Sequence, residues 1–142
     1  MFIDTHAHLF FENFKDDIDE VINRALESGV DYIVVPATDL KTAREAIALS
    51  EKYKQVYATV GIHPHDTKDW DESLIPQIEE LAKHPKVVAI GEIGLDYYYD
   101  FSPQDQQIKA FKSQLDLAIE LELPVVIHNR DSDGDMMDII QS

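Results

Sequence analysis

Short apolar runs alternate along the chain with longer segments in which apolar residues recur at helical spacing. The runs that predict β-strands are Phe2–Thr5, Tyr32–Pro36, Val56–Ile62, Val87–Glu92 and Val125–His128. Between the first two runs, Ile18, Val21 and Ala25 follow the spacing of an amphipathic helix. Strands that are apolar throughout and alternate with helices are typical of a parallel sheet covered by helices, which places the chain in the α/β class.

Two of the predicted helices carry recognisable start signals. Asp39 and Thr42 are both possible caps for the helix that follows the second predicted strand. Ser102, with Pro103 at the first helical position and Asp105 at the third, predicts the start of the helix before the fifth strand. These signals strengthen the assignment of helices between the strands.

The polar residues around the predicted strands separate two possible architectures. A doubly wound open sheet and the beginning of a (β/α)8 barrel both fit the order of elements. Residues that follow or end a predicted strand include His6, His8, His63, His65, Glu92 and His128. The carboxyl ends of all strands meet at one rim of a barrel, whereas an open sheet joins only the strands beside its switch point. We therefore expect residues 1–142 to form a single domain, a parallel sheet of βα units that is the N-terminal five-eighths of a TIM (β/α)8 barrel.

Composition narrows the chemistry of any site at that rim. The 142 residues include no cysteine, so a metal ion would be held by imidazole and carboxylate groups, which suit Zn, Mn, Fe or Mg. The formal net charge of −16 disfavours passive binding of nucleic acid, and a phosphate substrate would need local positive charge such as divalent cations supply. No apolar run approaches the roughly 20 residues that span a bilayer, and no secretory signal is recognisable. We expect no membrane association and a cytoplasmic location.

A metal site is one interpretation of His6, His8, Glu92 and His128. In an extended segment His6 and His8 share one face. Glu92 follows the apolar run VVAIG, where an ionised carboxylate without a cation or hydrogen-bond donors would be costly. Each histidine also has a plainer interpretation, since His6 and His8 could be solvated surface residues and His128 a core residue with satisfied hydrogen bonds.

Other polar features admit plainer interpretations too. His63 and His65 flank a proline and could simply shape a loop, and His84 follows a helix as a solvated loop residue. The stretch DSDGD has the first three spacings of a calcium loop, but its sixth and twelfth positions lack the required Gly and Glu, so we reject an EF-hand. We expect its aspartates to cap the next helix, beside Arg130, which is available for a phosphate or a carboxylate.

Four motifs, FIDTHAHL, VGIHPH, IGEIGLDYY and LPVVIHNRD, occur in order over nearly the whole chain and resemble the TatD family of metal-dependent hydrolases, in the amidohydrolase superfamily. The resemblance implies a TIM-barrel deoxyribonuclease that uses two divalent cations, with Mg, Mn or Zn as candidates, to cut DNA phosphodiester bonds, usually as an exonuclease. The metal ligands implied by matching motif are His6, His8, Glu92 and His128, with Glu92 bridging the two ions. His63 and Arg130 lie where substrate-contacting residues are expected.

Hydrolysis would also need a carboxylate that accepts a proton from water. Glu92 is the plausible catalytic residue at the rim, and Asp96 and Asp131 are weaker choices. The family's barrel continues through three more strands that bring a further metal-binding histidine and a late aspartate. This sequence ends inside the helix predicted after the fifth strand, whereas a complete barrel takes about 250 residues.

The short sheet leads to one structural expectation and three functional ones. The first and fifth strands would be open edges beside an exposed apolar interior, which favours self-association or a rearranged sheet. The leading function is metal-dependent cleavage of DNA. The alternatives are hydrolysis of a different ester or amide bond on the same scaffold, and a catalytically silent, truncated fragment that binds metal or associates with itself.

Overall fold

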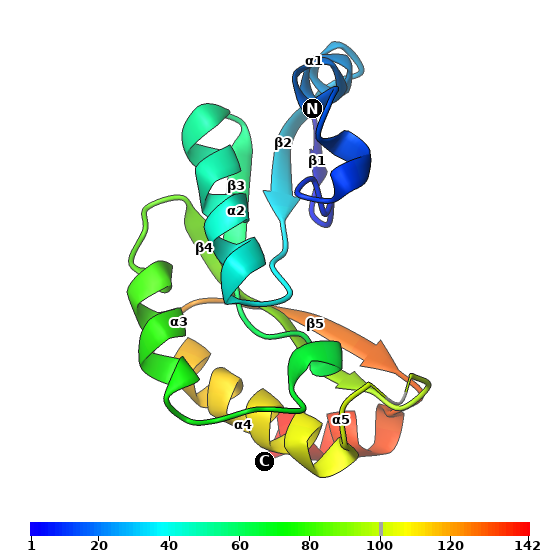
Figure 1. Ribbon diagram of the computed structural model, residues 1–142, viewed down its shortest axis with the longest axis vertical. Helices are drawn as coiled ribbons and strands as arrows, with labels where there is room; N and C mark the ends of the chain where they lie inside the picture. Colours follow the sequence, from blue (N-terminus) through cyan, green and yellow to red (C-terminus); the bar gives the residue numbers. More distant parts are fainter. Residues whose placement is uncertain (100) are drawn as a thin grey trace.

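The structure is a computed structural model that describes residues 1–99 and 101–142, and its elements follow one another along an arc (Figure 1). The strands are β1 (Phe2–Asp4), β2 (Val30–Val35), β3 (Val56–Val60), β4 (Val87–Asp96) and β5 (Val125–Arg130). The α-helices are α1 (Ile18–Glu27), α2 (Leu40–Lys52), α3 (Leu74–Ala82), α4 (Gln104–Glu120) and α5 (Asp133–Gln141). Two short 3-10 helices, η1 (Glu12–Phe14) and η2 (Pro64–Asp66), follow β1 and β3.

The topology decides between the two architectures. The strands form one sheet in the order β1-β2-β3-β4-β5, and every neighbouring pair is parallel. The spatial order therefore repeats the chain order and has no switch point, which a doubly wound sheet requires. The expected fold is confirmed: five parallel strands with helices between them form part of a TIM-type barrel.

Two predicted strand ends are wrong in a way that affects the site. β4 does not end at Glu92 but runs on to Asp96, and β5 continues past His128 to Arg130. The two strands pair over this extra length, with Gly94 opposite His128 and Asp96 opposite Arg130. Glu92 and His128 therefore lie inside paired strands, where the backbone is fixed by its neighbour.

The predicted helix caps have mixed outcomes. Asp39 caps α2, since its carboxylate accepts a hydrogen bond from the Thr42 backbone N–H at 2.7 Å and the Thr42 hydroxyl reaches back. The Ser102 cap is wrong, because α4 begins at Gln104 after Pro103 and the Ser102 hydroxyl donates to the His65 carbonyl instead. The aspartates of DSDGD do not cap α5 either, because Ser132 occupies the N-cap position and no side chain makes a capping bond there.

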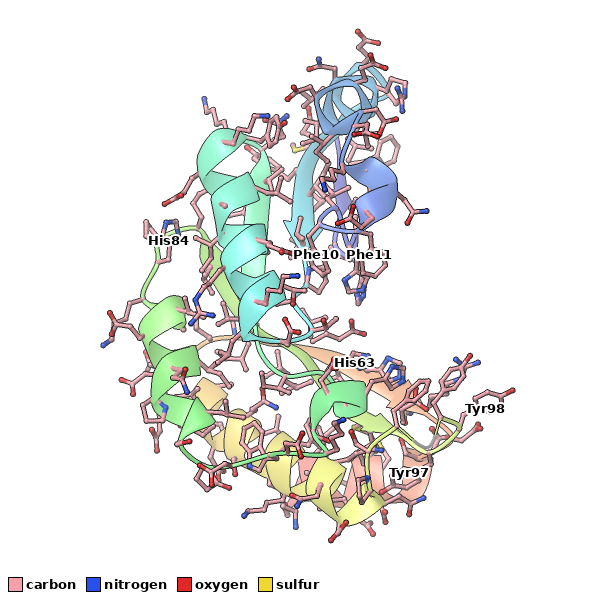
Figure 2. All side chains as sticks on the ribbon, in the orientation of Figure 1. Phe10, Phe11, His63, His84, Tyr97 and Tyr98 are labelled. Atoms are coloured by element: carbon pink, nitrogen blue, oxygen red, sulfur yellow. The ribbon has the colours of Figure 1, made fainter. Side chains whose placement is uncertain are left out.

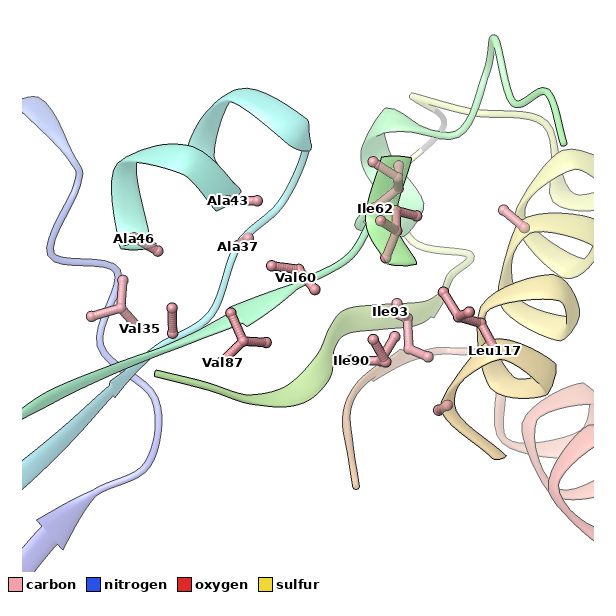
Figure 3. Close-up of a cluster of buried hydrophobic side chains, with 14 of the residues drawn as sticks. Val35, Ala37, Ala43, Ala46, Val60, Ile62, Val87, Ile90, Ile93 and Leu117 are labelled. Carbon is pink, nitrogen blue, oxygen red and sulfur yellow. The ribbon is translucent and has the colours of Figure 1, made fainter. Parts of the chain in front are cut away.

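The main hydrophobic core lies between the sheet and the helices. Figure 3 shows small side chains of α2, Ala43 and Ala46, beside Val35 of β2, and all three are fully buried. Farther along the sheet, Leu117 of α4 faces Ile93 of β4. Burial of one Val, Leu or Ile side chain stabilises the folded state by about 1.5–3 kcal/mol, so this layer holds the strands that carry the site.

The opposite face of the sheet is open. Ile33 and Val35 of β2 face the helices, so the alternate residues Tyr32 and Val34 face the other way. The residues that line a hollow on this face are Ile3, Tyr32, Val34, Tyr57 and Val88. Both edge strands expose apolar side chains, Ile3 at 55% and Ile127 at 37%. The expected open edges and exposed interior are confirmed, while self-association stays a prediction.

Candidate metal centre

The His6–His8 pair lies in the irregular segment just after β1. The two Nε2 atoms are 3.2 Å apart, so both rings point to the same place. The His8 Nδ1 atom lies 2.9 Å from the Pro36 carbonyl oxygen, which can only accept a hydrogen bond. His8 therefore carries a proton on Nδ1, and its Nε2 lone pair is available to a metal ion in the neutral ring.

The Glu92 carboxylate stands between two groups of histidines. Its Oε2 atom lies 3.3 Å from the Nε2 of His6 and 3.4 Å from the Nε2 of His8. Its Oε1 atom lies 3.3 Å from the Nδ1 of His128. Burial, which leaves Glu92 5% exposed, would raise its pKa, but the imidazoles beside the carboxylate, those of His128 and His8 first, hold the pKa well below its usual range. Glu92 is therefore an ionised carboxylate in a nearly closed position.

His63 is the most buried imidazole of the site. Burial lowers its pKa to about 3, against the opposing charge of Glu92, so the ring is neutral at ordinary pH. The His63 Nδ1 accepts a hydrogen bond from the His65 backbone N–H at 3.1 Å, which leaves the proton on Nε2. The Nε2 nitrogen of His63 lies 3.9 Å from the Oε1 atom of Glu92. In this tautomer His63 is a hydrogen-bond donor at the site.

Asp96, the last residue of β4, connects His65 with His128. Its Oδ2 atom lies 2.8 Å from the Nε2 of each ring, and its Oδ1 atom accepts the backbone N–H groups of Tyr98 and Tyr99. The residue is fully buried. Burial alone would raise its pKa, but the Tyr99 N–H and the two imidazoles lower the pKa to about 2. Because Asp96 accepts from the His128 Nε2, it orients the Nδ1 of that ring toward Glu92.

Gly94 allows β4 and β5 to approach closely at this point. Its φ of +141° is rarely adopted by other residues, and a Cβ atom built on it would lie 2.0 Å from the His128 carbonyl oxygen. The absence of a side chain therefore lets the His128 backbone pack directly against β4. This contact sets the distance between the His128 ring and Glu92.

These residues open into a cavity of about 630 Å³. Its lining includes His8, Phe11, Thr38, His63, His65, Asp66, Lys68, Glu92 and Phe101. Lys68 brings a positive charge to this acidic chain at the cavity wall. Figure 2 shows His63 between the segment that carries Phe11 and the one that carries Tyr98. The cavity is therefore walled by aromatic rings as well as by the histidines.

The structure brings most of the predicted site residues together. His6, His8, Glu92 and His128 form one connected group, and His63 lies beside it. Arg130 is displaced from the cavity, with its guanidinium over the rings of Tyr98 and Tyr99 at 4.5 and 4.9 Å from their centres. His84 lies apart, with its Nε2 3.2 Å from a Glu51 carboxylate oxygen.

Sequence reasoning missed two contributions. The sequence places His65 at the rim but assigns it no role, and its His-x-His spacing with His63 is the feature that could have indicated one. From the sequence, Asp96 is only a weaker candidate for the proton acceptor. In the structure its carboxylate instead accepts four hydrogen bonds and is buried from solvent. In the motif GLDYY, Asp96 is a polar residue after an apolar strand, and the structure shows that its hydrogen-bond partners include two imidazoles.

The donor set fits a divalent cation most directly at the first group. Ligand atoms of His6, His8 and Glu92 lie within 4.8 Å of one another, and so do those of His63, His65 and His128. In the second group, the Nε2 atoms of His65 and His128 are both hydrogen-bonded to Asp96. Imidazole and carboxylate ligands are typical of Zn and Mn sites. The side chains of this centre could therefore bind metal, with His6 as the exposed member of the first group and Glu92 as its buried member.

Comparison with known proteins agrees with this geometry. A family model described as TatD related DNase matches residues 3–142. The chain is 46% identical over 141 residues to a protein of Bacillus subtilis strain 168 named uncharacterized metal-dependent hydrolase YabD, covering 99% of this chain and 55% of that protein. It is 36% identical over 138 residues to the 3'-5' ssDNA/RNA exonuclease TatD of Escherichia coli K12, covering 97% of this chain and 53% of that enzyme.

A solved structure shares the fold. The crystal structure of YjjV, a TatD homologue from Escherichia coli K12, superposes with a TM-score of 0.91 at 34% sequence identity, covering 99% of this chain and 55% of that one. The chain thus spans about half the length of the proteins that it matches. Since the family model matches nearly every residue, the chain belongs to the TatD related DNase family.

Proposed function

We propose that this chain acts in the metal-dependent hydrolysis of DNA phosphodiester bonds, releasing nucleotides from a strand end, through a site for two divalent cations. The observation that carries the proposal is the Glu92 carboxylate, which is buried between two histidine groups and directs one oxygen to each. A relative at 36% identity is named a 3'-5' ssDNA/RNA exonuclease, which supports nucleic acid as the substrate.

Each side chain has a definite part in this proposal. His6, His8 and Glu92 would hold one ion, and Glu92 with the Nδ1 of His128 would contribute to the second. Divalent cations, when bound, lower the pKa of water and stabilise negative charge on phosphoryl oxygens. Mg, Mn and Zn are all candidates, because the donor set is compatible with each.

The remaining residues act on the substrate and the proton. The Nε2–H of His63 can donate a hydrogen bond to a phosphoryl oxygen, because the Nδ1 of the ring is already an acceptor. Lys68 at the cavity wall, and Arg130 outside the cavity beside Tyr98, would supply positive charge to the phosphate backbone of a bound strand. Glu92 is our choice for the proton acceptor, since the oxygens of Asp96 are occupied by hydrogen bonds.

The first test follows nucleotide release from an end-labelled single-stranded DNA oligonucleotide in the presence of Mg²⁺, Mn²⁺ or Zn²⁺. We expect release that depends on metal and falls by about a hundredfold or more in Glu92→Ala, because the site loses its bridging ligand. Glu92→Gln, which keeps the size of the side chain, should be equally impaired. Glu51→Ala is the matched control, since the Glu51 carboxylate is hydrogen-bonded to His84, outside the site.

The alternatives predict different results from the same proteins. Unchanged release in Glu92→Ala would contradict the proposal. Turnover of carboxylic esters or amides in a substrate panel, with no release from DNA, would favour a different hydrolase on this scaffold. Metal binding by calorimetry without any turnover would favour a chain that binds metal but does not catalyse.

Within the part of the chain that the structure describes, no helix has the length and apolar character to cross a membrane. The cytoplasmic location and the single domain over residues 1–142 stay predictions.

A further inference from the structure

Three exposed aromatic side chains lie in the segment that follows β4, next to the candidate metal centre. Tyr98 is 60% exposed, Tyr99 38% and Phe101 58%. The rings of Tyr99 and Phe101 are stacked, with an interplanar angle of 9° and centres 5.2 Å apart. We call these three residues the aromatic platform. Because the three rings adjoin one another, they form a contiguous exposed aromatic patch, and such patches mark interaction sites.

The aromatic platform is continuous with the site. The His65 ring contacts both Tyr99 and Phe101 edge-on, with ring centres 5.5 and 4.9 Å apart. Phe101 also lines the same cavity as Glu92 and His63. The backbone N–H groups of Tyr98 and Tyr99 are held by the Asp96 carboxylate, which fixes the platform relative to the histidines. A phosphodiester beside Glu92 would therefore have Phe101 of the platform in the wall of its cavity.

The charges near the aromatic platform also favour a nucleic acid as the ligand. The Arg130 guanidinium lies over the faces of Tyr98 and Tyr99. Rings next to a cation are the usual combination in proteins that bind single strands, where bases stack and phosphates meet positive charge. Since the chain has a net charge of −16, general attraction to a polyanion is absent. Affinity must then come from local cations and from stacking.

We propose that the aromatic platform stacks the bases of a single-stranded nucleic acid next to the phosphodiester to be cleaved. The inference rests on the proposed function, because it assumes a nucleic acid at the site.

The test measures binding without turnover. The anisotropy of a labelled phosphorothioate oligothymidylate with Mn²⁺ is compared with that of an abasic strand of the same length and charge. We expect Tyr99→Ala and Phe101→Ala to weaken binding of the oligothymidylate by about five- to 150-fold, and to leave binding of the abasic strand unchanged. Tyr99→Phe and Phe101→Tyr keep the ring and should bind like the parent protein. Phe2→Ala removes a still more exposed ring, 68% exposed on β1, and is the control.

Every outcome bears on the aromatic platform. Equal loss for both strands, equal affinity of the parent protein for both, or no loss in the alanine variants would overturn it. Weaker binding of the oligothymidylate alone in the alanine variants, without any hydrolysis by the parent protein, would support base stacking and contradict the nuclease activity. Metal-dependent hydrolysis with unchanged binding in the alanine variants would support the nuclease activity and contradict base stacking, so the two proposals fail separately.

Discussion

The two His-x-His pairs of this chain share a sequence pattern but not an arrangement. His6 and His8 converge, with their Nε2 atoms 3.2 Å apart and both close to one oxygen of Glu92. His63 and His65 diverge: the first faces Glu92 from 3.9 Å, and the second bonds Asp96 at 2.8 Å. The first pair is also more open at its tip, since the His6 side chain is 42% exposed and that of His63 is 8%.

The cause of the difference is the backbone around each pair. His6 and His8 lie in an irregular segment after β1, where the Pro36 carbonyl accepts a hydrogen bond from the His8 Nδ1 and so directs the Nε2 of that ring toward Glu92. His63 caps η2 with its own ring, and the turn carries His65 toward β4. The same residue spacing therefore makes His6 and His8 a pair of candidate metal ligands, whereas His63 is a hydrogen-bond donor at the site and His65 is hydrogen-bonded to Asp96.

Removal of one imidazole from each pair tests whether the two pairs differ in metal binding. We expect His8→Ala to weaken Mn²⁺ binding by about a hundredfold or more, because a direct ligand is lost. His65→Ala should weaken Mn²⁺ binding by less than about tenfold, because the Nε2 of that ring is hydrogen-bonded to Asp96 and is not a direct metal ligand. Titration calorimetry on both variants and the parent protein measures this. Equal losses would mean that His65 is also a ligand.

A smaller effect is expected from Asp96→Asn. The amide keeps the shape of the side chain but cannot accept from two imidazoles and two backbone N–H groups at once, so the His128 ring loses its orientation. Outer hydrogen-bond partners of metal ligands are worth about ten- to a hundredfold in affinity, and we expect a loss of Mn²⁺ binding in that range. Asp135→Asn, which alters the hydroxyl partner of Tyr97, is the control. An unchanged affinity in Asp96→Asn would show that the His128 Nδ1 is held without Asp96.

The smallest effect concerns Tyr97, which ties the end of β4 to α5 through a 2.5 Å hydrogen bond from its hydroxyl to Asp135. Burial, with the hydrogen bond to Asp135 and its charge, raises the pKa of Tyr97 above its ordinary value of 10.0. Above about pH 10 the unfolded chain then loses this proton while the folded chain keeps it, so stability falls as pH rises.

Tyr97→Phe tests this pH dependence. The variant should lose about 0.5–1.5 kcal/mol at neutral pH, from the missing hydrogen bond, and show a shallower decline above about pH 10. Urea unfolding of both proteins at about pH 7, 9 and 11 provides the comparison. Parallel pH profiles for the two proteins would contradict the role given to Tyr97.

Much of the fold followed from local patterns. The apolar runs predicted five strands in the right places, and the histidines after β1 and β3 predicted where a site would form. The errors arose where pairing between distant segments extends an element, as at Asp96 and Arg130, or where a side chain bonds across the fold, as Ser102 does with His65. Propensity and capping rules describe a chain segment by itself and have no information about such partners.

Residue type and spacing are enough to establish the alternation of strands and helices and the set of imidazoles and carboxylates that could meet at one rim. The fold is needed to show which nitrogen of His8 and His128 faces Glu92, that Asp96 is a hydrogen-bond acceptor, and that the aromatic platform adjoins the site. Each of these features depends on a contact with a distant part of the chain, such as Pro36 with His8 or Gly94 with His128. Those contacts exist only once the parallel sheet has formed.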